Sequence, residues 1–158
     1  MSEKYYLTRK GLEKIEKDRQ ALLDLHRKKI KEDLPPAWEV SEASAEYLGY
    51  REDMALMETR LAEYEKILKN AEVITPPPKS ERGVVGLGAT VTLEEEPGGK
   101  INEYTILGKL EANPLEGKIS AESPVGRELL GKRVKGLVVI RSPINVSYRV
   151  KKISYRIS

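Results

Sequence analysis

The 158-residue sequence predicts an α+β protein in two parts, a helical hairpin followed by a small antiparallel β-sheet with one short helix. Three observations predict this arrangement. Apolar side chains recur at helical spacing in residues 1–74, and they alternate with polar side chains in residues 84–158. Residues 75–83, between these parts, contain three consecutive prolines, which favour a stiff and extended linker. We therefore expect two domains, residues 1–74 and 84–158, which are joined by a linker of residues 75–83.

The composition excludes several classes of protein. There is no cysteine, so disulfides and thiolate metal sites are not available. No stretch approaches the roughly 18 apolar residues of a membrane span, and no secretion signal is recognisable, so we expect a cytoplasmic location. The formal charge is −2 over residues 1–74 and +5 over residues 75–158, which indicates two modules that face different partners.

The first helix is expected from Thr8 to Glu32, with Thr8 as its N-cap. Arg19 and His26 interrupt its apolar stripe, which consists of Leu12, Ile15, Leu22, Leu25 and Ile30. We expect His26, the only histidine, to be a partly exposed helix residue, because no second histidine or cysteine supports a metal site. The two prolines that follow Leu34 end this helix.

The second helix has a more regular pattern. Apolar residues recur at alternating steps of three and four, which is a heptad seam: Tyr47, Tyr50, Met54, Met57, Leu61, Tyr64, Leu68 and Ala71. Two helices of similar length with a short proline-containing connection are expected to pack antiparallel in one chain. This arrangement buries both stripes in a monomer, and we favour it over a parallel dimeric coiled coil.

The connection between the two helices is acidic. From Glu32 through Tyr50 the sequence has five carboxylates and no lysine or arginine. Glu39 and Glu42 are three residues apart, so on a helix they would share a face and offer oxygen ligands to a divalent cation such as Mg²⁺. The alternative interpretation is that these acids complement the dipole at the start of the second helix. Both interpretations remain open from the residues alone.

The C-terminal half is expected to form an antiparallel sheet. Strands are predicted at 88–93, 101–107, 118–120, 136–141 and 147–155, with a turn at 94–100 and a helix at 124–130 that begins after Ser123 as N-cap. No nucleophile and base pair is recognisable there. Several basic residues of this half are expected to form a general electropositive face, which would bind DNA or RNA without sequence preference. They are Lys132, Arg133, Lys135, Lys151 and Lys152.

The sequence resembles the bacterial Gre transcript-cleavage factors (GreA/GreB-like) along essentially the whole chain. In the helical half the matching segments are Leu7-Thr8-Arg9-Lys10-Gly11, Ala45-Glu46-Tyr47 with Arg51-Glu52, and Leu68 through Ile74. In the C-terminal half they are Gly86 through Val91, Ile119-Ser120, and Ser123 through Lys132. The run Ser123-Pro124-Val125-Gly126-Arg127, after a heptad hairpin, is the most specific of these.

The resemblance implies a fold and a mechanism. It implies that residues 1–74 form a coiled coil that enters the secondary channel of RNA polymerase, and that residues 84–158 form an FKBP-like domain that docks at the channel rim. Docking is then expected to use Ser123, Pro124, Gly126 and Arg127. At the tip, Glu39 and Glu42 would act at the polymerase active site as ligands of a shared catalytic Mg²⁺, near the 3′ end of backtracked RNA. The factor would have no cofactor of its own and would not be an independent enzyme.

The tip departs from the family pattern, which is roughly Gly-Asp-Leu-x-Glu-Asn-Ala-Glu-Tyr. Glu39 and Glu42 keep the spacing between the two acids, but one extra residue separates Glu42 from Ala45. Counting strictly back from Tyr47 would place Val40 and Ala43 at the acidic positions. A channel-occupying regulator that inhibits or modulates transcription is therefore the main alternative. Two weaker alternatives are a prolyl isomerase and a protein that binds nucleic acid without polymerase.

Overall fold

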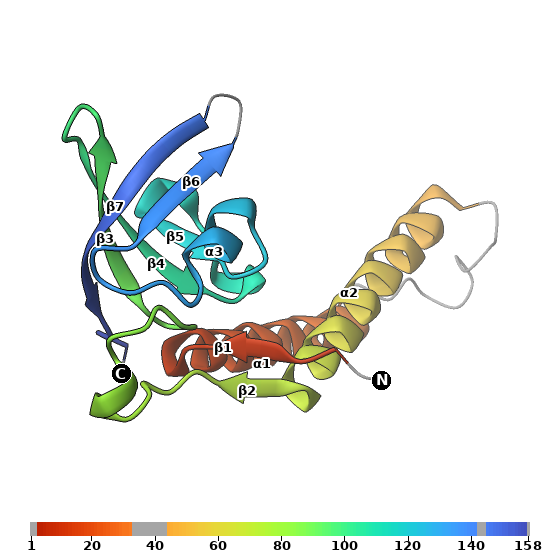
Figure 1. The fold of residues 1–158 in the computed structure, drawn as a ribbon. Helices are drawn as coiled ribbons and strands as arrows, with labels where there is room; N and C mark the ends of the chain where they lie inside the picture. The colour runs from red at the N-terminus through yellow and green to blue at the C-terminus, as the bar shows by residue number, and fades with distance from the viewer. Residues whose placement is uncertain (1–2, 33–43, 142–144, 158) are drawn as a thin grey trace. The chain divides into compact units, whose positions relative to one another are not determined.

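The computed structural model describes residues 3–32, 44–141 and 145–157, and Figure 1 shows their helices and strands. The contacts divide the chain into two units. The helical unit is Leu12–Asn70, and the sheet unit joins Glu3–Gly11 to Ala71–Ser158. The domain boundaries expected from the sequence stay a prediction. None of the helices in the described part of the chain is long and apolar enough to cross a membrane.

Two long helices form the helical unit. Helix α1 spans Arg9–Glu32 and helix α2 spans Ala45–Lys69. Helix α2 begins after Ser44, whose hydroxyl accepts a hydrogen bond from the backbone N–H of Tyr47 at 3.4 Å. Among the described residues, ion pairs join the helices at Arg19–Glu65 (3.4 Å) and Lys29–Asp53 (3.2 Å), and Nε2 of His26 lies 3.6 Å from a carboxylate oxygen of Glu58. Residue numbers rise along α1 as they fall along α2, so the hairpin is antiparallel, as predicted.

The seam predicted for α2 is the covered side of that helix. Its seven positions from Tyr47 to Leu68 are all buried or half-buried, whereas most other residues of α2 are exposed. Leu61 is 8% exposed, and Leu56, which is outside the seam, is 59% exposed. The eighth predicted position, Ala71, does not belong to the helix and lies in a strand.

The stripe predicted for α1 is only partly correct. Leu25 and Ile30 are 50% and 43% exposed, although they were expected in the seam. Six half-buried positions follow the heptad spacing instead, and they include polar residues: Leu12, Ile15, Arg19, Leu22, His26 and Lys29. Gly11, Asp18 and Leu23 are also half-buried. The seam of α2 dictates which face of α1 is covered. The polar residues fit because their long stems pack while their charged or polar ends meet acids of α2.

A parallel pair of three-residue strands, which the sequence did not predict, belongs to the sheet unit. Strand β1 is Tyr5–Leu7 and strand β2 is Ala71–Val73, and Tyr5 is opposite Ala71. Leu7 is completely buried, and its carbonyl accepts a hydrogen bond from the N–H of Ile74 at 2.8 Å. The segment that precedes α1 is therefore anchored beside the segment that follows α2.

The main sheet has five strands in the order β5-β4-β3-β7-β6. Their bounds are Thr90–Glu96 (β3), Ile101–Leu107 (β4), Lys118–Ser120 (β5), Leu137–Arg141 (β6) and Asn145–Ser154 (β7). Three pairings are antiparallel, as predicted, but β5 runs parallel to β4, so the sheet is mixed. Short 3-10 helices occur at Lys79–Glu81 (η2), Lys109–Glu111 (η3) and Pro114–Glu116 (η4).

Helix α3, Pro124–Leu129, lies against β5 and β6 and completes the hydrophobic core (Figure 1). Leu129 of this helix is fully buried together with Leu93, Ile106 and Val138 from the strands. Tyr155 packs against this core, and its hydroxyl accepts a hydrogen bond from the N–H of Gly86 at 2.9 Å and donates one to the carbonyl of Val84 at 2.6 Å. Burial raises the pKa of Tyr155, and the Gly86 N–H opposes that effect.

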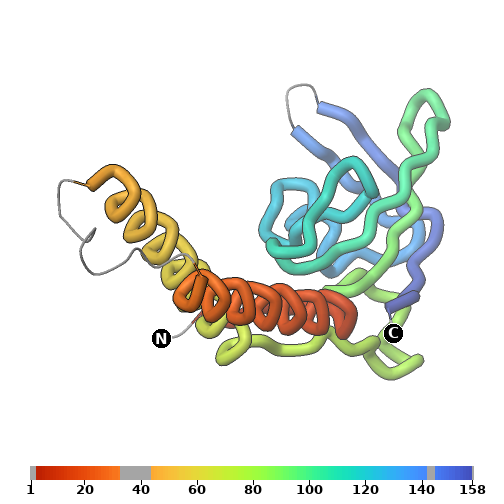
Figure 2. The backbone as a smooth tube through the Cα atoms, turned by 180° about the vertical axis from the view of Figure 1, so that it is seen from behind, coloured from red at the N-terminus to blue at the C-terminus, as the bar shows by residue number. Residues whose placement is uncertain are grey.

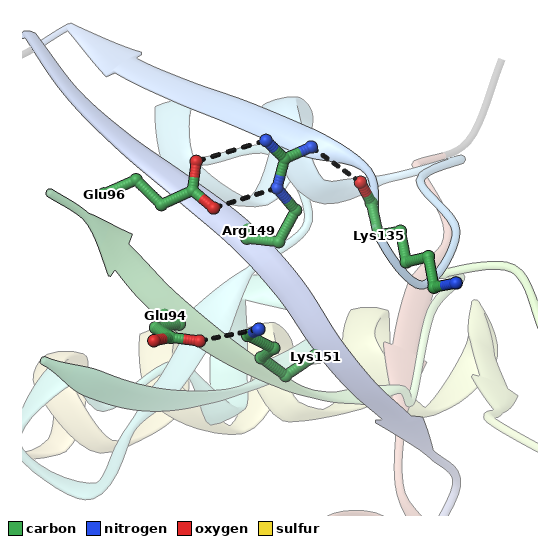
Figure 3. Close-up of polar contacts among 5 residues, drawn as sticks. All are labelled: Glu94, Glu96, Lys135, Arg149 and Lys151. Carbon is green, nitrogen blue, oxygen red and sulfur yellow. Dashed lines mark hydrogen bonds and ion pairs between the residues drawn. The ribbon is translucent and has the colours of Figure 1, made fainter. Parts of the chain in front are cut away.

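The residues Glu94–Glu96 extend strand β3, so the turn predicted at 94–100 is wrong for these three residues. Each of them faces a residue of β7, and β3 and β4 continue as a long hairpin, shown in green in Figure 2. Ion pairs explain why acids are compatible with this strand. Arg149 donates to both oxygens of Glu96 at 3.0 and 3.1 Å, and Lys151 lies 2.8 Å from Glu94 (Figure 3).

Candidate functional site

The structure describes one of the two groups of predicted site residues and not the other. Glu39 and Glu42 lie outside the described residues, so their role at the tip stays a prediction. Ser123, Pro124, Gly126 and Arg127 lie at the start of α3, where Pro124 and Arg127 are exposed and Gly126 is buried. Within the described ranges, no group of three or more acids or histidines is arranged to hold a metal ion.

Ser123 is the N-cap of α3, as predicted. Its hydroxyl accepts a hydrogen bond from the N–H of Gly126 at 3.1 Å and donates one to the carbonyl of Ser120 at 2.6 Å. Pro124 occupies the first helical position, where its lack of an N–H has no cost. The cap thus attaches the start of the helix to the end of β5. The Ser123 hydroxyl uses its hydrogen bonds within the protein.

Gly126 is required by close packing and not by an unusual backbone angle. A Cβ at this position would lie 2.1 Å from the carbonyl oxygen of Ser120 and 3.1 Å from Cα of Ala121. Both contacts are with backbone, so a side chain would push α3 away from β5. Two of the four predicted partner-binding residues, Ser123 and Gly126, therefore shape the surface.

Pro124 and Arg127 are the exposed members of the predicted set. No ion pair joins the Arg127 guanidinium to any carboxylate of the described residues. They line a groove of about 260 Å³ between α3 and β6, together with Glu128, Val139, Ile140 and Arg141. An exposed proline and an unpaired guanidinium, held rigidly by a capped helix, are suited to contact a partner that carries negative charge.

A second surface feature, which the sequence analysis missed, is a mainly apolar cavity of about 310 Å³ next to the same segment. Its lining includes Tyr5, Tyr6, Leu107, Leu110 and Leu130, with Ser120 through Glu122 at one side. The missed signal was the run Tyr5-Tyr6-Leu7, which has strand-like residues but is too short to give a recognisable period.

One wall of this cavity is held by Lys109. Its ammonium group is paired with Glu3 and lies 5.3 Å from the centre of the Tyr5 ring. The hydrogen bond to Glu3 raises the pKa of Lys109, with smaller contributions from the charges of Glu3, Tyr5 and Glu122. Lys109 therefore stays protonated near neutral pH and keeps β1 next to η3.

Comparison with known families accounts for both halves of the chain. Residues 5–73 match the N-terminal model of transcription elongation factors, and residues 79–155 match the C-terminal GreA/GreB model. The chain belongs to the GreA/GreB family of transcription elongation factors. The resemblance inferred from the sequence motifs is therefore confirmed, and so is the α+β fold with its helical hairpin.

Two GreA proteins agree with this family assignment. The transcription elongation factor GreA of Shouchella clausii is 41% identical over 142 residues, which cover 89% of this chain and 89% of the relative. GreA of Chloroflexus aggregans is 40% identical, with 89% and 90% of the two chains covered. Among solved structures, GreA factor homolog 1 (Gfh1) of Thermus thermophilus is 25% identical with a TM-score of 0.44, covering 96% of this chain and 99% of that one.

Proposed function

We propose that this protein binds RNA polymerase, inserts its helical hairpin into the secondary channel and stimulates cleavage of backtracked RNA. Membership of the GreA/GreB family supports an elongation factor, and the acidic connection of the hairpin is the observation that carries the proposal further. This connection has five carboxylates between Glu32 and Tyr50 and no basic residue to neutralise them. We expect the protein to act as a monomer in the cytoplasm.

The hairpin has the dimensions of an arm. Helix α1 has 24 residues, so at 1.5 Å per residue it is about 36 Å long. Such an arm has a covered seam but no enclosed core, and its end is the connection that carries Glu39 and Glu42. An arm of this length suits the delivery of these carboxylates to a site that lies deep inside a partner.

The donor set suits the proposed metal. Glu39 and Glu42 offer carboxylate oxygens, the ligands that Mg²⁺ prefers, and no histidine or cysteine lies between residues 33 and 43 to favour a softer ion. When it is bound at the polymerase active site, Mg²⁺ supplies Lewis-acid activation of water for hydrolysis. In this proposal the two carboxylates hold and orient the Mg²⁺ ion, and the polymerase catalyses the hydrolysis of the RNA.

The sheet unit would supply the docking surface at the channel rim. Pro124 and Arg127 are exposed on the capped start of α3, and Ser123 and Gly126 hold that start rigidly against β5. The net charge of +5 in residues 75–158 favours an acidic partner surface.

An RNA cleavage assay on a stalled, backtracked polymerase complex tests the proposal. The wild-type protein is expected to shorten the RNA in the presence of Mg²⁺. Glu39→Ala and Glu42→Ala are each expected to slow cleavage at least about tenfold, or about 1.4 kcal/mol of transition-state stabilisation, without loss of polymerase binding. Glu63→Ala, at an exposed position of α2, is the matched control and should cleave like the wild type. The proposal fails if the wild-type protein binds the complex and leaves the RNA intact.

The extra residue between Glu42 and Ala45 favours a second candidate, a regulator that occupies the channel without stimulating cleavage. The same assay separates the two functions. A regulator would slow elongation or initiation, and this effect would persist in the Glu39→Ala/Glu42→Ala double variant. A cleavage factor would lose its effect on backtracked complexes in that variant.

A further inference from the structure

Strand β6 is a free edge of the main sheet. Within the part of the chain that the structure describes, it pairs only with β7, and the opposite edge, β5, has only three residues. The first four residues of β6, Leu137 through Ile140, are aliphatic, and Leu137 is 45% exposed. An exposed apolar edge presents unpaired N–H and C=O groups and is a template for another strand.

The hydrogen bonds next to β6 define which backbone groups face outward. Lys135 donates to the carbonyl of Val150 at 2.8 Å, and Val150 donates to the carbonyl of Gly136 at 3.0 Å. Lys135 has a φ of 72°, so this is a β-bulge in which Gly136 is opposite Val150. Hydrogen-bonded and non-hydrogen-bonded pairs alternate along antiparallel strands, and Leu137 is opposite Arg149 in the next pair. The N–H and C=O groups of Leu137, Val139 and Arg141 therefore point away from β7, toward the free edge.

The groove between α3 and β6 gives this edge a shape and a charge. Its volume is about 260 Å³, and Val139 and Ile140 supply the apolar part of its lining. Two arginines and one acid, Arg127, Arg141 and Glu128, also line it, and neither arginine forms an ion pair with a carboxylate of the described residues. Peptides add as a further strand to exposed sheet edges, where main-chain hydrogen bonds give affinity and pockets for alternate side chains give specificity.

We propose that this groove binds an extended acidic peptide segment as a sixth strand, paired with the outward-facing groups of Leu137, Val139 and Arg141. Side chains alternate along β6, so Val139 and Arg141 lie on one face, and Ile140 lies on the other with the buried Val138. Acidic side chains of the peptide contact Arg141 on the first face, and its apolar side chains contact Ile140 on the second. This binding mode goes beyond the proposed action on backtracked RNA and does not require the hairpin tip.

Charge favours an acidic peptide over a second copy of this chain. If two copies paired through β6 antiparallel about Val139, each copy would bring two arginines, Arg127 and Arg141, and only one acid, Glu128, to the shared edge. Both copies also carry a net charge of +5 in residues 75–158. An excess of like charge at an interface is costly, whereas carboxylates of an acidic peptide would pair with the Arg141 guanidinium.

Fluorescence anisotropy of the full-length protein with a labelled peptide of alternating Glu and Val tests the proposal. Binding is expected to saturate below about 1 mM and to weaken at least about tenfold in Arg141→Glu. Lys100→Glu makes the same charge change on the exposed β3–β4 turn and should bind like the wild type. Val139→Pro removes one outward N–H and should also abolish binding. Circular dichroism of each variant establishes that it is folded.

Hydrogen exchange identifies the binding mode. Peptide binding is expected to slow amide exchange at Leu137, Val139 and Arg141 and to leave α2 unchanged. The proposal is overturned if the peptide does not bind up to about 1 mM, or if an alternating Lys and Val peptide binds equally well. It is also overturned if the slowed amide exchange appears at residues outside β6. Self-association of the protein through β6 in sedimentation experiments would overturn it as well. None of these outcomes depends on cleavage activity, so the two proposals are tested separately.

Discussion

The N-cap of α1 depends on a contact within the helix and on a second contact with a residue far away in the sequence. Thr8 caps α1 by accepting a hydrogen bond from the N–H of Gly11 at 3.1 Å, and this cap was predictable from the sequence. Its second partner was not, because Glu111 lies 103 residues away and accepts from both the N–H and the hydroxyl of Thr8 at 2.6 Å. A Cβ on Gly11 would lie 2.6 Å from the Glu111 carboxylate, which explains why glycine follows three residues after the cap.

Gly126→Ala is expected to destabilise the sheet unit by about 2–3 kcal/mol, because the new methyl group would overlap the Ser120 carbonyl and force α3 outward. Urea denaturation followed by far-ultraviolet circular dichroism measures this loss. Gly49→Ala is the matched control, since a Cβ there meets no atom within 4 Å, and it should stabilise α2 by about 0.5–1 kcal/mol. Equal effects of the two changes would contradict the packing argument.

At the scale of elements, the sequence predicted most helix and strand positions. It did not predict which face of α1 is covered, the pairing of β1 with β2, or the parallel pairing of β5 with β4. The α2 seam was predictable because seven of its positions follow the heptad without interruption. The covered face of α1 was not, because apolar residues were counted and Arg19 and His26 were treated as interruptions. Their partners, Glu65 and Glu58, lie on α2 and are visible only in the fold. Strands β1 and β2 were missed since three residues give no period.

The hairpin seam predicts a contrast between two leucines of α2. Leu61→Ala is expected to lower the stability of the hairpin by about 2–3 kcal/mol, because Leu61 is only 8% exposed. Leu56→Ala makes the same chemical change at a position that is 59% exposed, and should cost less than about 0.5 kcal/mol. Thermal denaturation at 222 nm measures both. A smaller effect at Leu61 than at Leu56 would exclude the assigned seam.

The pair between β3 and β7 predicts a pH-dependent contribution to stability. The hydrogen bonds from Arg149 lower the pKa of Glu96, and the charges of Arg149 and Lys151 add to this effect while burial opposes it. A lowered carboxyl pKa stabilises the fold above the unfolded value of about 4.3, and this contribution is lost as the pH falls through the folded pKa. A double-mutant cycle with Glu96→Gln and Arg149→Gln should therefore show coupling at pH 7 and almost none at pH 2. Coupling that persists at pH 2 would rule out the ionised pair as its source.

At the scale of the whole molecule, the family motifs predicted the fold and the identity of the family, while the assembly of the sheet unit needed the structure. Residues 3–11 precede the hairpin in sequence but belong with residues 71–158. The helical unit is thus an insertion between two pieces of the sheet unit. A sequence pattern that is read along the chain places Tyr5 and Tyr6 with the helix that they precede, because no local signal indicates a parallel partner after residue 70.

This insertion predicts that residues 12–70 can be replaced by a short Gly/Ser linker with the sheet unit still folded. A chain truncated to residues 75–158 should be less stable than the linked chain by at least about 3 kcal/mol, because it loses Leu7 and Ile74, which are 0% and 5% exposed. It also loses the Thr8–Glu111 hydrogen bonds. Urea denaturation of the two chains measures the difference. The linked chain with Leu7→Ala isolates the part due to β1, and should fall between the two. If the truncated chain is as stable as the linked one, residues 3–11 and 71–74 do not belong to the folding unit of the sheet.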